Sequence, residues 1–211
     1  MILDNFGIST TKAFEPKANS ALLVIDLQND FCPGGALPVA NGDQVIEPLN
    51  RMISHAHKNE QSVFLSRDWH PLNAKHFKPT GNWPIHCVED TPGAEFHSSL
   101  KYLGSDYVVS KGTDPEENGY SAFEGKTYFR PLDEVLRYFK VKKLYIGGLA
   151  TDYCVKNTCL DARKLGYIVY LLTDTCRAVN QKPGDEALAL NEMANAGVKF
   201  TTTDEVIDKA R

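Results

Sequence analysis

The chain has 211 residues, a formal net charge of -4 at pH 7 and 42% hydrophobic residues. A chain of this length and composition can bury one continuous core, so we expect a single domain over residues 1–211. The slightly acidic balance, with lysine and arginine scattered along the chain, argues against nucleic acid as a partner.

Residues 1–18 are expected to form an N-terminal extension before the first strand. This segment lacks the basic start and apolar core of a secretory signal, and no apolar stretch is long enough to cross a bilayer. The five cysteines have irregular spacings that suggest neither a disulfide framework nor a zinc ribbon. We therefore expect reduced thiols, a cytoplasmic location and no membrane partner.

Six apolar runs rich in Val, Ile and Leu predict strands that are covered on both faces. In chain order they span residues 21–27, 62–68, 106–112, 142–148, 167–174 and 198–204. Apolar residues at helical spacing alternate with these runs at 45–58, 132–140, 152–166 and 185–197. This alternation predicts a three-layer α/β/α fold, in which helices cover both faces of a mostly parallel six-stranded sheet.

Reactive side chains stand where four of the predicted strands end, at Asp26, Asp68, Lys111 and shortly before Cys154. Ligands bind outside the carboxyl ends of the strands in open α/β sheets, so these side chains are candidate site residues. A buried Lys111 ammonium needs counter-charges, which Asp26 and a Cys154 thiolate would supply. Desolvation after the apolar run ALLVI suits Asp26 to act as a general base. Asp174, at the end of a fifth predicted strand, is expected to be a structural cap instead.

Cys154 lies in the stretch GLATDYCVKNTC, at the predicted start of a helix. We expect Thr151 to cap this helix, and the positive end of the helix to favour the thiolate. The alternative for Cys154 is a small buried hydrophobe. Cys159 would point about 140° away from it at roughly 100° per residue, so the two do not form a redox pair.

A long stretch, residues 69–100, is rich in Pro, His and Trp and is expected to be a functional loop. Asp68 lies directly before this stretch, and His70 is its second residue. Alternation along an extended chain places both side chains on the same side, where they could share an ion. The third ligand would come from His76 or His86. Carboxylate and imidazole ligands suit Zn, Fe or Mn. The alternative is a turn with a solvated histidine.

Motifs spread from residue 21 to about residue 180 read VIDLQNDFCPGGALPV, DWHP, WPIHC, SKG, YSAF and GLATDYCVKNTCLDA. In these motifs the sequence resembles the nicotinamidases, a branch of the isochorismatase-like cysteine hydrolase family. The resemblance implies an isochorismatase-like fold with a Rossmann-like strand order. It also implies that Asp26, Lys111 and Cys154 form the catalytic triad.

The same resemblance implies one divalent metal ion, zinc or else iron or manganese, held by Asp68, His70 and His86. His76 stands at the offset where some members have a further histidine ligand, and we keep it as a candidate. A cis peptide is implied between Leu149 and Ala150, with the amides of Ala150 and Cys154 as the oxyanion hole. Substrate-binding positions carry over to Phe31, Trp83, Leu149 and Tyr153.

The activity implied by the resemblance is hydrolysis of nicotinamide to nicotinate and ammonia through a thioester on Cys154. Pyrazinamide is expected to be a further substrate, and the reaction would serve NAD salvage. The expected partner is thus a small molecule, and assembly into a homo-oligomer is compatible with this. One alternative is a related enzyme acting on another small amide or a ureido compound. The other is a non-catalytic binding scaffold.

Overall fold

The computed structural model describes residues 18–208, which contribute to one eight-stranded sheet. The expected extension, residues 1–18, lies outside the described residues except for Ala18. That the chain forms a single domain stays a prediction.

The sheet consists of six strands of three to ten residues and two strands of two residues each. They are β1 (Ser20–Ile25), β2 (Ser62–Asp68), β3 (Tyr107–Lys111), β4 (Lys126–Thr127), β5 (Arg130–Pro131), β6 (Lys143–Leu149), β7 (Ile168–Arg177) and β8 (Lys199–Thr201). The helices are α1 (Ile46–Lys58), α2 (Leu132–Tyr138), α3 (Lys156–Lys164), α4 (Asp185–Asn195) and α5 (Thr203–Asp208), with a π-helical turn at Thr151–Val155 before α3.

The strand order is β5-β4-β3-β2-β1-β6-β7-β8. The six longer strands are all parallel, and without β4 and β5 their order is that of a Rossmann-type sheet. The predicted mostly parallel sheet is thereby confirmed, but its size of six strands is corrected to eight. The two additional strands, β4 and β5, pair antiparallel at one edge.

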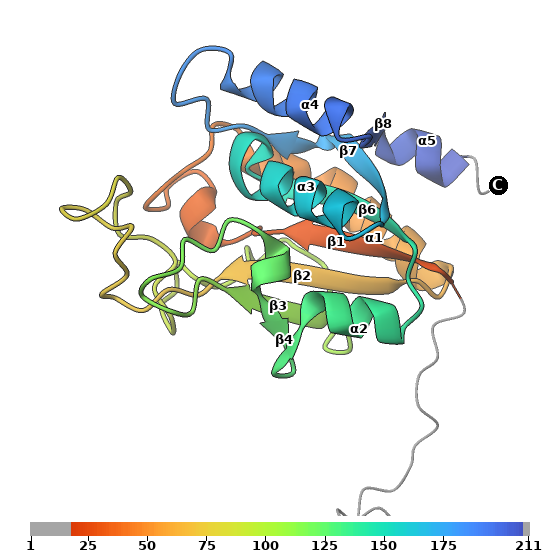
Figure 1. Ribbon diagram of the computed structural model, residues 1–211, viewed down its shortest axis with the longest axis horizontal. Helices are drawn as coiled ribbons and strands as arrows, with labels where there is room; N and C mark the ends of the chain where they lie inside the picture. The colour runs from red at the N-terminus through yellow and green to blue at the C-terminus, as the bar shows by residue number, and fades with distance from the viewer. Residues whose placement is uncertain (1–17, 209–211) are drawn as a thin grey trace, which may run out of the picture.

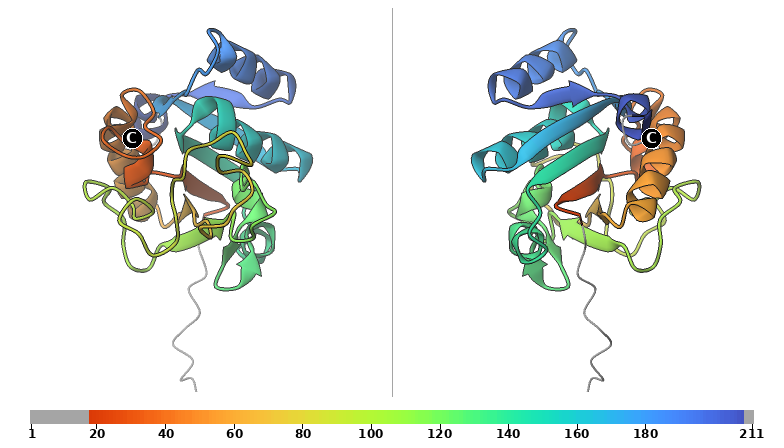
Figure 2. Two further views of the ribbon diagram at one scale, coloured as in Figure 1. Left: turned by 90° about the vertical axis from the view of Figure 1, so that its left-hand side faces the viewer. Right: turned by 90° about the vertical axis from the view of Figure 1, so that its right-hand side faces the viewer.

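Helices cover both faces of the sheet, as predicted. Figure 2 shows α1 and α5 on one face and α2, α3 and α4 on the other. Alternate residues of β1 pack into the two layers: Leu23 and Ile25 join the core under α2 and α3, whereas Leu22 and Val24 join the core under α1. Because β1 is buried on both faces, its sequence is apolar at every position from Ala21 to Ile25, as expected for a central parallel strand.

Two predicted boundaries at the C-terminal end of the chain are wrong. The strand predicted at 167–174 continues to Arg177, and the run predicted at 198–204 leaves the sheet after Thr201. Thr203 then begins α5, which the periodicity of the sequence did not indicate. Asp174 accepts hydrogen bonds from the amide and hydroxyl of Thr203, so it is a structural cap as expected, for α5.

The loops that follow the parallel strands gather at one end of the sheet, on the left of Figure 1. The long segment 69–100 crosses this end, and Figure 2 (left) shows it in front of the strand ends. Among residues 18–208, no helix combines the length and apolarity needed to span a bilayer. The strand ends beneath the long loop are therefore where the predicted site residues must be sought.

Candidate active site

Lys111 brings three of the predicted side chains together at the carboxyl ends of the strands. Its ammonium lies 2.8 Å from Asp26 Oδ2 and donates a hydrogen bond to Cys154 Sγ at 3.5 Å. It also donates to the Gly119 carbonyl at 2.6 Å and to Asp68 Oδ1. The Lys111 side chain is completely buried, so these neighbours replace the water that the ammonium loses.

Asp26 occupies a sharp turn directly after β1. Its φ of 50° lies in the left-handed region, which non-glycine residues seldom adopt. The Asp26 amide donates to the Ser66 carbonyl at 3.1 Å, and the Ser66 hydroxyl donates to Asp26 Oδ1 at 2.7 Å. β2 therefore fixes one carboxylate oxygen, and the other faces Lys111.

The two carboxylates beside Lys111 differ in their proton affinity. Burial raises the pKa of Asp26 above its ordinary value, and the neighbouring Asp68 adds to this, although Lys111 opposes it. Burial also acts to raise the pKa of Asp68, but Lys111 and the neighbouring His70 outweigh it and hold that pKa well below the usual range. When the pKa values of two neighbouring carboxyl groups are shifted in opposite directions, the group with the higher pKa can act as a base and the other remains an anion. Asp26 is thus suited to exchange a proton, while Asp68 stays ionised.

The turn that carries Cys154 differs from the prediction in two ways. It is π-helical, its N-cap is Ala150, and the Thr151 hydroxyl donates to Glu186 at 3.4 Å instead of capping the turn. Burial raises the pKa of the Cys154 thiol well above its ordinary value, despite the opposing effect of Lys111. Burial therefore opposes the thiolate that the helix end was expected to favour. A protonated thiol needs a base, and a carboxylate oxygen of Asp26 lies within 4.8 Å of the sulfur.

Three buried histidines, His70, His76 and His86, form a cluster beside the triad, with one ring nitrogen of each within 4.8 Å of those of the others. Nδ1 of His70 bonds the Gly112 carbonyl at 2.9 Å, and Nδ1 of His86 bonds the Pro84 carbonyl at 2.8 Å. These bonds leave Nε2 as the nitrogen that each of these two rings could offer to an ion. Hydrogen bonds of this kind orient metal-binding histidines in proteins.

Glycine is required at position 112 for this arrangement. Gly112 has a φ of +63°, and a Cβ atom there would lie 2.4 Å from Cε1 of His70. The Gly112 carbonyl can therefore approach the His70 ring closely enough for a hydrogen bond only because residue 112 has no side chain.

Asp68 lies between the histidine cluster and the triad. Its Oδ2 is 3.6 Å from Nε2 of His70, while its Oδ1 accepts from Lys111. The structure thus brings together all the residues predicted as metal ligands, including the candidate His76. It also shows that Asp68 is shared with Lys111, which the sequence did not indicate.

A narrow cavity joins the two groups. It is lined by Phe31, Leu37, Val39, Asp68, His76, Trp83, His86, Asn118, Tyr120, Leu149, Ala150, Tyr153, Cys154 and Val179. The four residues predicted to bind substrate, Phe31, Trp83, Leu149 and Tyr153, are all in this lining. The peptide between Leu149 and Ala150 is cis, as the resemblance implies.

Tyr120 also lines the cavity, and the sequence predicts no role for it. Its hydroxyl accepts a hydrogen bond from Nε1 of Trp83 at 2.8 Å, and its ring lies 5.8 Å from that of Tyr153. The three aromatic side chains thus support one another across one wall. The motif YSAF contains Tyr120, but nothing in the spacing of that motif indicates which ring the tyrosine would meet.

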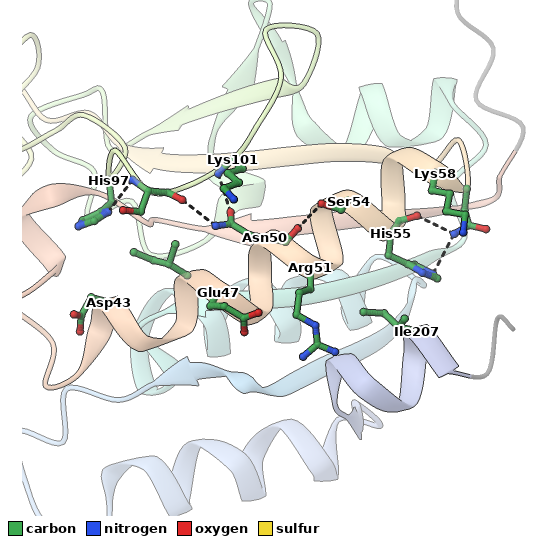
Figure 3. A pocket seen from close by; sticks show the side chains of 13 residues that line it. Asp43, Glu47, Asn50, Arg51, Ser54, His55, Lys58, His97, Lys101 and Ile207 are labelled. Atoms are coloured by element: carbon green, nitrogen blue, oxygen red, sulfur yellow. Dashed lines mark hydrogen bonds between the residues drawn. The ribbon is translucent and has the colours of Figure 1, made fainter.

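A wider groove of about 890 Å³ lies elsewhere, along the outer side of α1 (Figure 3). It runs between α1, α5 and residues 97–101, and Asn50, Arg51 and His55 are among its lining residues. The groove contains none of the residues predicted for catalysis or metal binding. The narrow cavity is therefore the candidate active site.

Comparison with known proteins agrees with this fold. The isochorismatase domain matches residues 20–205. The chain belongs to the isochorismatase family. Nicotinamidase of Escherichia coli is 42% identical over 200 residues, covering 86% of this chain and 94% of that protein. Asp26, Lys111 and Cys154 all fall inside the segment that matches the family.

Two solved structures resemble the chain closely. Pyrazinamidase of Pyrococcus horikoshii in complex with zinc has a TM-score of 0.81 and 44% identity, covering 88% of this chain and 99% of that chain. PnC1 from L. infantum in complex with nicotinate has a TM-score of 0.80 and 32% identity, covering 88% of this chain and 93% of that chain.

Proposed function

We propose that the protein is a nicotinamidase, which hydrolyses nicotinamide to nicotinate and ammonia. The observation that carries this proposal is the buried Lys111 ammonium held between Asp26 and the sulfur of Cys154 at an aromatic-lined cavity. The identity to Escherichia coli nicotinamidase and the likeness to a structure with bound nicotinate support the same substrate. The likeness to a pyrazinamidase supports pyrazinamide as a further substrate.

The proposed biological setting is NAD salvage in the cytoplasm, with nicotinate as the product that is reused. All five cysteines are free and buried, which fits a reducing compartment. Ammonia release from nicotinamide by the purified protein is the primary test. Equal or faster release from a ureido compound would contradict the proposed substrate.

A divalent metal ion fits the histidine cluster. Nε2 of His70 and both ring nitrogens of His76 are buried without a hydrogen-bond partner among the described residues, which is costly unless a ligand satisfies them. We infer that His70, His76 and His86 hold the ion together with Asp68. Zinc suits imidazole and carboxylate ligands, and the zinc complex of the Pyrococcus horikoshii pyrazinamidase supports it over iron or manganese.

When bound, the ion would supply a Lewis-acidic contact for the pyridine nitrogen of the substrate. The chain's own residues orient the rest of the ring. Phe31 and Trp83 supply apolar surfaces in the cavity, and the Tyr120 hydroxyl keeps the Trp83 indole in place. Such fixing of the substrate holds its carboxamide carbon near the sulfur of Cys154, which reduces the entropic part of the barrier.

In the first half of the proposed reaction, Asp26 takes the proton of the Cys154 thiol and the sulfur attacks the carboxamide carbon. The Lys111 ammonium stabilises the negative charge that forms on the sulfur. The amides of Ala150 and Cys154 are proposed to receive the oxyanion, where loss of one donor typically costs about 3 kcal/mol. Asp26 then returns the proton to the departing ammonia, which leaves a thioester on Cys154.

In the second half, water attacks the thioester carbon and Asp26 takes a proton from that water. The carbon–sulfur bond breaks, nicotinate leaves, and the proton passes from Asp26 to the sulfur. The raised pKa of Asp26 suits both halves, since the same carboxyl group must accept and return a proton in each.

The acid side of the pH profile should report Asp26. Because burial raises the pKa of Asp26 and the base works only when ionised, kcat/KM should fall with decreasing pH at a midpoint above 3.8, the ordinary carboxyl value. The Ser66 hydroxyl lowers this pKa, so Ser66→Ala should move the midpoint to higher pH. Ser62→Ala is the matched control, because Ser62 is also buried in β2 and its hydroxyl has no described partner. An unmoved midpoint in Ser66→Ala would show that another group titrates.

Removal of the metal should abolish ammonia release and leave the core intact. The triad does not depend on the ion for its contacts, so near-ultraviolet circular dichroism should not change on chelation. His76→Ala should weaken zinc binding by about 10²-fold or more, measured by competition with a chromophoric chelator. His55→Ala, in the groove along α1, should bind zinc like the wild type. Full activity of the metal-stripped protein would contradict the assignment.

A further inference from the structure

A further buried carboxylate, Asp152, lies in the turn that carries Cys154 and has no task in the mechanism described above. The residue is 6% exposed. Oδ1 of Asp152 accepts the amide of Val179 at 2.9 Å, and Oδ2 accepts the amide of Asn180 at 2.8 Å. Hydrogen bonds from amides to an ionised carboxylate are shorter and stronger than those between neutral groups. Asp152 therefore holds two consecutive amides of another segment with both of its oxygens.

The segment that Asp152 holds is the loop 178–184, which connects β7 with α4 at the upper left of Figure 1. Asn180 has a φ of 50°, and its side-chain oxygen accepts the amide of Glu186 at 3.0 Å, in the first turn of α4. Glu186 in turn accepts the hydroxyl of Thr151, the residue before Asp152. The contacts thus close a circuit from the turn of Cys154 through the loop to α4 and back.

Two parts of this circuit, the turn of Cys154 and the loop 178–184, reach the candidate active site. Asp152 lies between Ala150, whose amide is proposed for the oxyanion hole, and Cys154, the proposed nucleophile. On the other side, Val179 lines the cavity together with Cys154. A shift of the Asp152 carboxylate would therefore move the reacting sulfur and one wall of the cavity relative to each other.

We propose that Asp152 is a positioning residue, which sets the Cys154 turn and the Val179 wall in one fixed relation and so governs both turnover and selectivity for ring size. The inference rests on the proposed nicotinamidase function. It assigns Asp152 no contact with the substrate. A merely structural anchor would stabilise the fold equally well but would leave turnover and selectivity unchanged once the protein is folded.

Asp152→Asn tests this role with little change in shape. The amide keeps one acceptor oxygen but turns an NH₂ group toward a backbone N–H, so one of the two bonds is lost. Asp174→Asn is the matched control, because the Asp174 carboxylate also accepts hydrogen bonds from two donor groups, the amide and the hydroxyl of Thr203 at the start of α5, and does not line the cavity. Both variants should lose a similar amount of thermal stability.

In assays well below the unfolding temperature, kcat of Asp152→Asn on nicotinamide should fall by about 10²-fold, with a much smaller change in KM. Its preference for nicotinamide over a ring-methylated nicotinamide should also decrease, because the Val179 wall is no longer fixed. Asp174→Asn should retain the kcat and the preference of the wild type. If Asp152→Asn matched Asp174→Asn in both kinetic readouts, the positioning role would be overturned.

Asn180→Gly provides a second variant if Asp152→Asn does not fold. Glycine tolerates the positive φ, and the substitution removes only the bond to the Glu186 amide at an exposed position. It should lower kcat and the preference in the same direction by a smaller factor, and unchanged values would overturn the inference. Absence of nicotinamide turnover by the wild type would instead overturn the proposed function itself.

Discussion

Cys154→Ala should lower ammonia release from nicotinamide by roughly 10⁴- to 10⁶-fold while the protein stays folded. The sulfur of Cys154 lies in the cavity wall and receives a hydrogen bond from Lys111, so its loss removes the proposed nucleophile. Losses of this size are typical when the nucleophile of a catalytic triad is removed. The cost in folding should be about 1 kcal/mol, because only one sulfur atom is removed from a buried position. Ammonia release and urea unfolding, measured on the same preparation, check both statements.

Cys159→Ala is the matched control for this variant. Cys159 is completely buried five residues further along, in α3, and packs in the core without lining the cavity. It should lose a similar small amount of stability and retain activity. Turnover retained in Cys154→Ala would refute covalent catalysis by this thiol.

Lys111→Met should destabilise the protein by about 3–5 kcal/mol and also abolish turnover. The ammonium is the counter-charge for both Asp26 and Asp68, and removing one partner of a buried ion pair leaves uncompensated charge in the interior. Urea unfolding at pH 7 measures this loss. Lys164→Met is the control, since Lys164 pairs with Asp161 at 2.9 Å on the surface, where such pairs contribute at most about 1 kcal/mol.

The destabilisation in Lys111→Met should shrink as the pH falls. Without the ammonium, burial raises the pKa of Asp26 in the folded state further above that of the unfolded chain, and the pKa of Asp68 loses the largest influence that lowers it. A raised folded pKa gives stability that is present at low pH and is lost as the pH rises through it. The difference from the wild type should therefore be smaller near pH 5 than at pH 8. If the difference in the free energy of unfolding did not depend on pH, the two carboxylates would have found other partners in Lys111→Met.

The six longer strands were predictable because each overlaps an apolar run, although only inner strands such as β1 and β2 are buried on both faces and the edge strand β8 is largely exposed. β4 and β5 were missed because two-residue strands have no periodicity to detect. α5 was missed for a related reason: its six residues follow directly on β8, and the run of threonines favoured a longer strand. Short elements at the edges depend on tertiary contacts that the local sequence does not encode.

The strand-end argument brought Asp26, Lys111 and Cys154 into one site because parallel strands place their carboxyl ends at the same edge. It could not indicate that Asp68 contacts Lys111 as well as the histidines, since that depends on side-chain geometry across three segments. The raised pKa of the Cys154 thiol was not predicted, because the position of a residue at a helix start does not reveal its burial, which is the largest influence on this pKa. The Asp152 contacts could not be predicted either, because their partner loop lies 27 residues further along the chain.

In the proposed mechanism an acyl group passes through the sulfur of Cys154, and a trapping experiment with hydroxylamine tests this most directly. If nicotinamide acylates the enzyme, added hydroxylamine should compete with water for the thioester, and nicotinohydroxamate should form at the expense of nicotinate. Cys154→Ala should form neither product. Nicotinate as the only product of the wild type at every hydroxylamine concentration would contradict the mechanism.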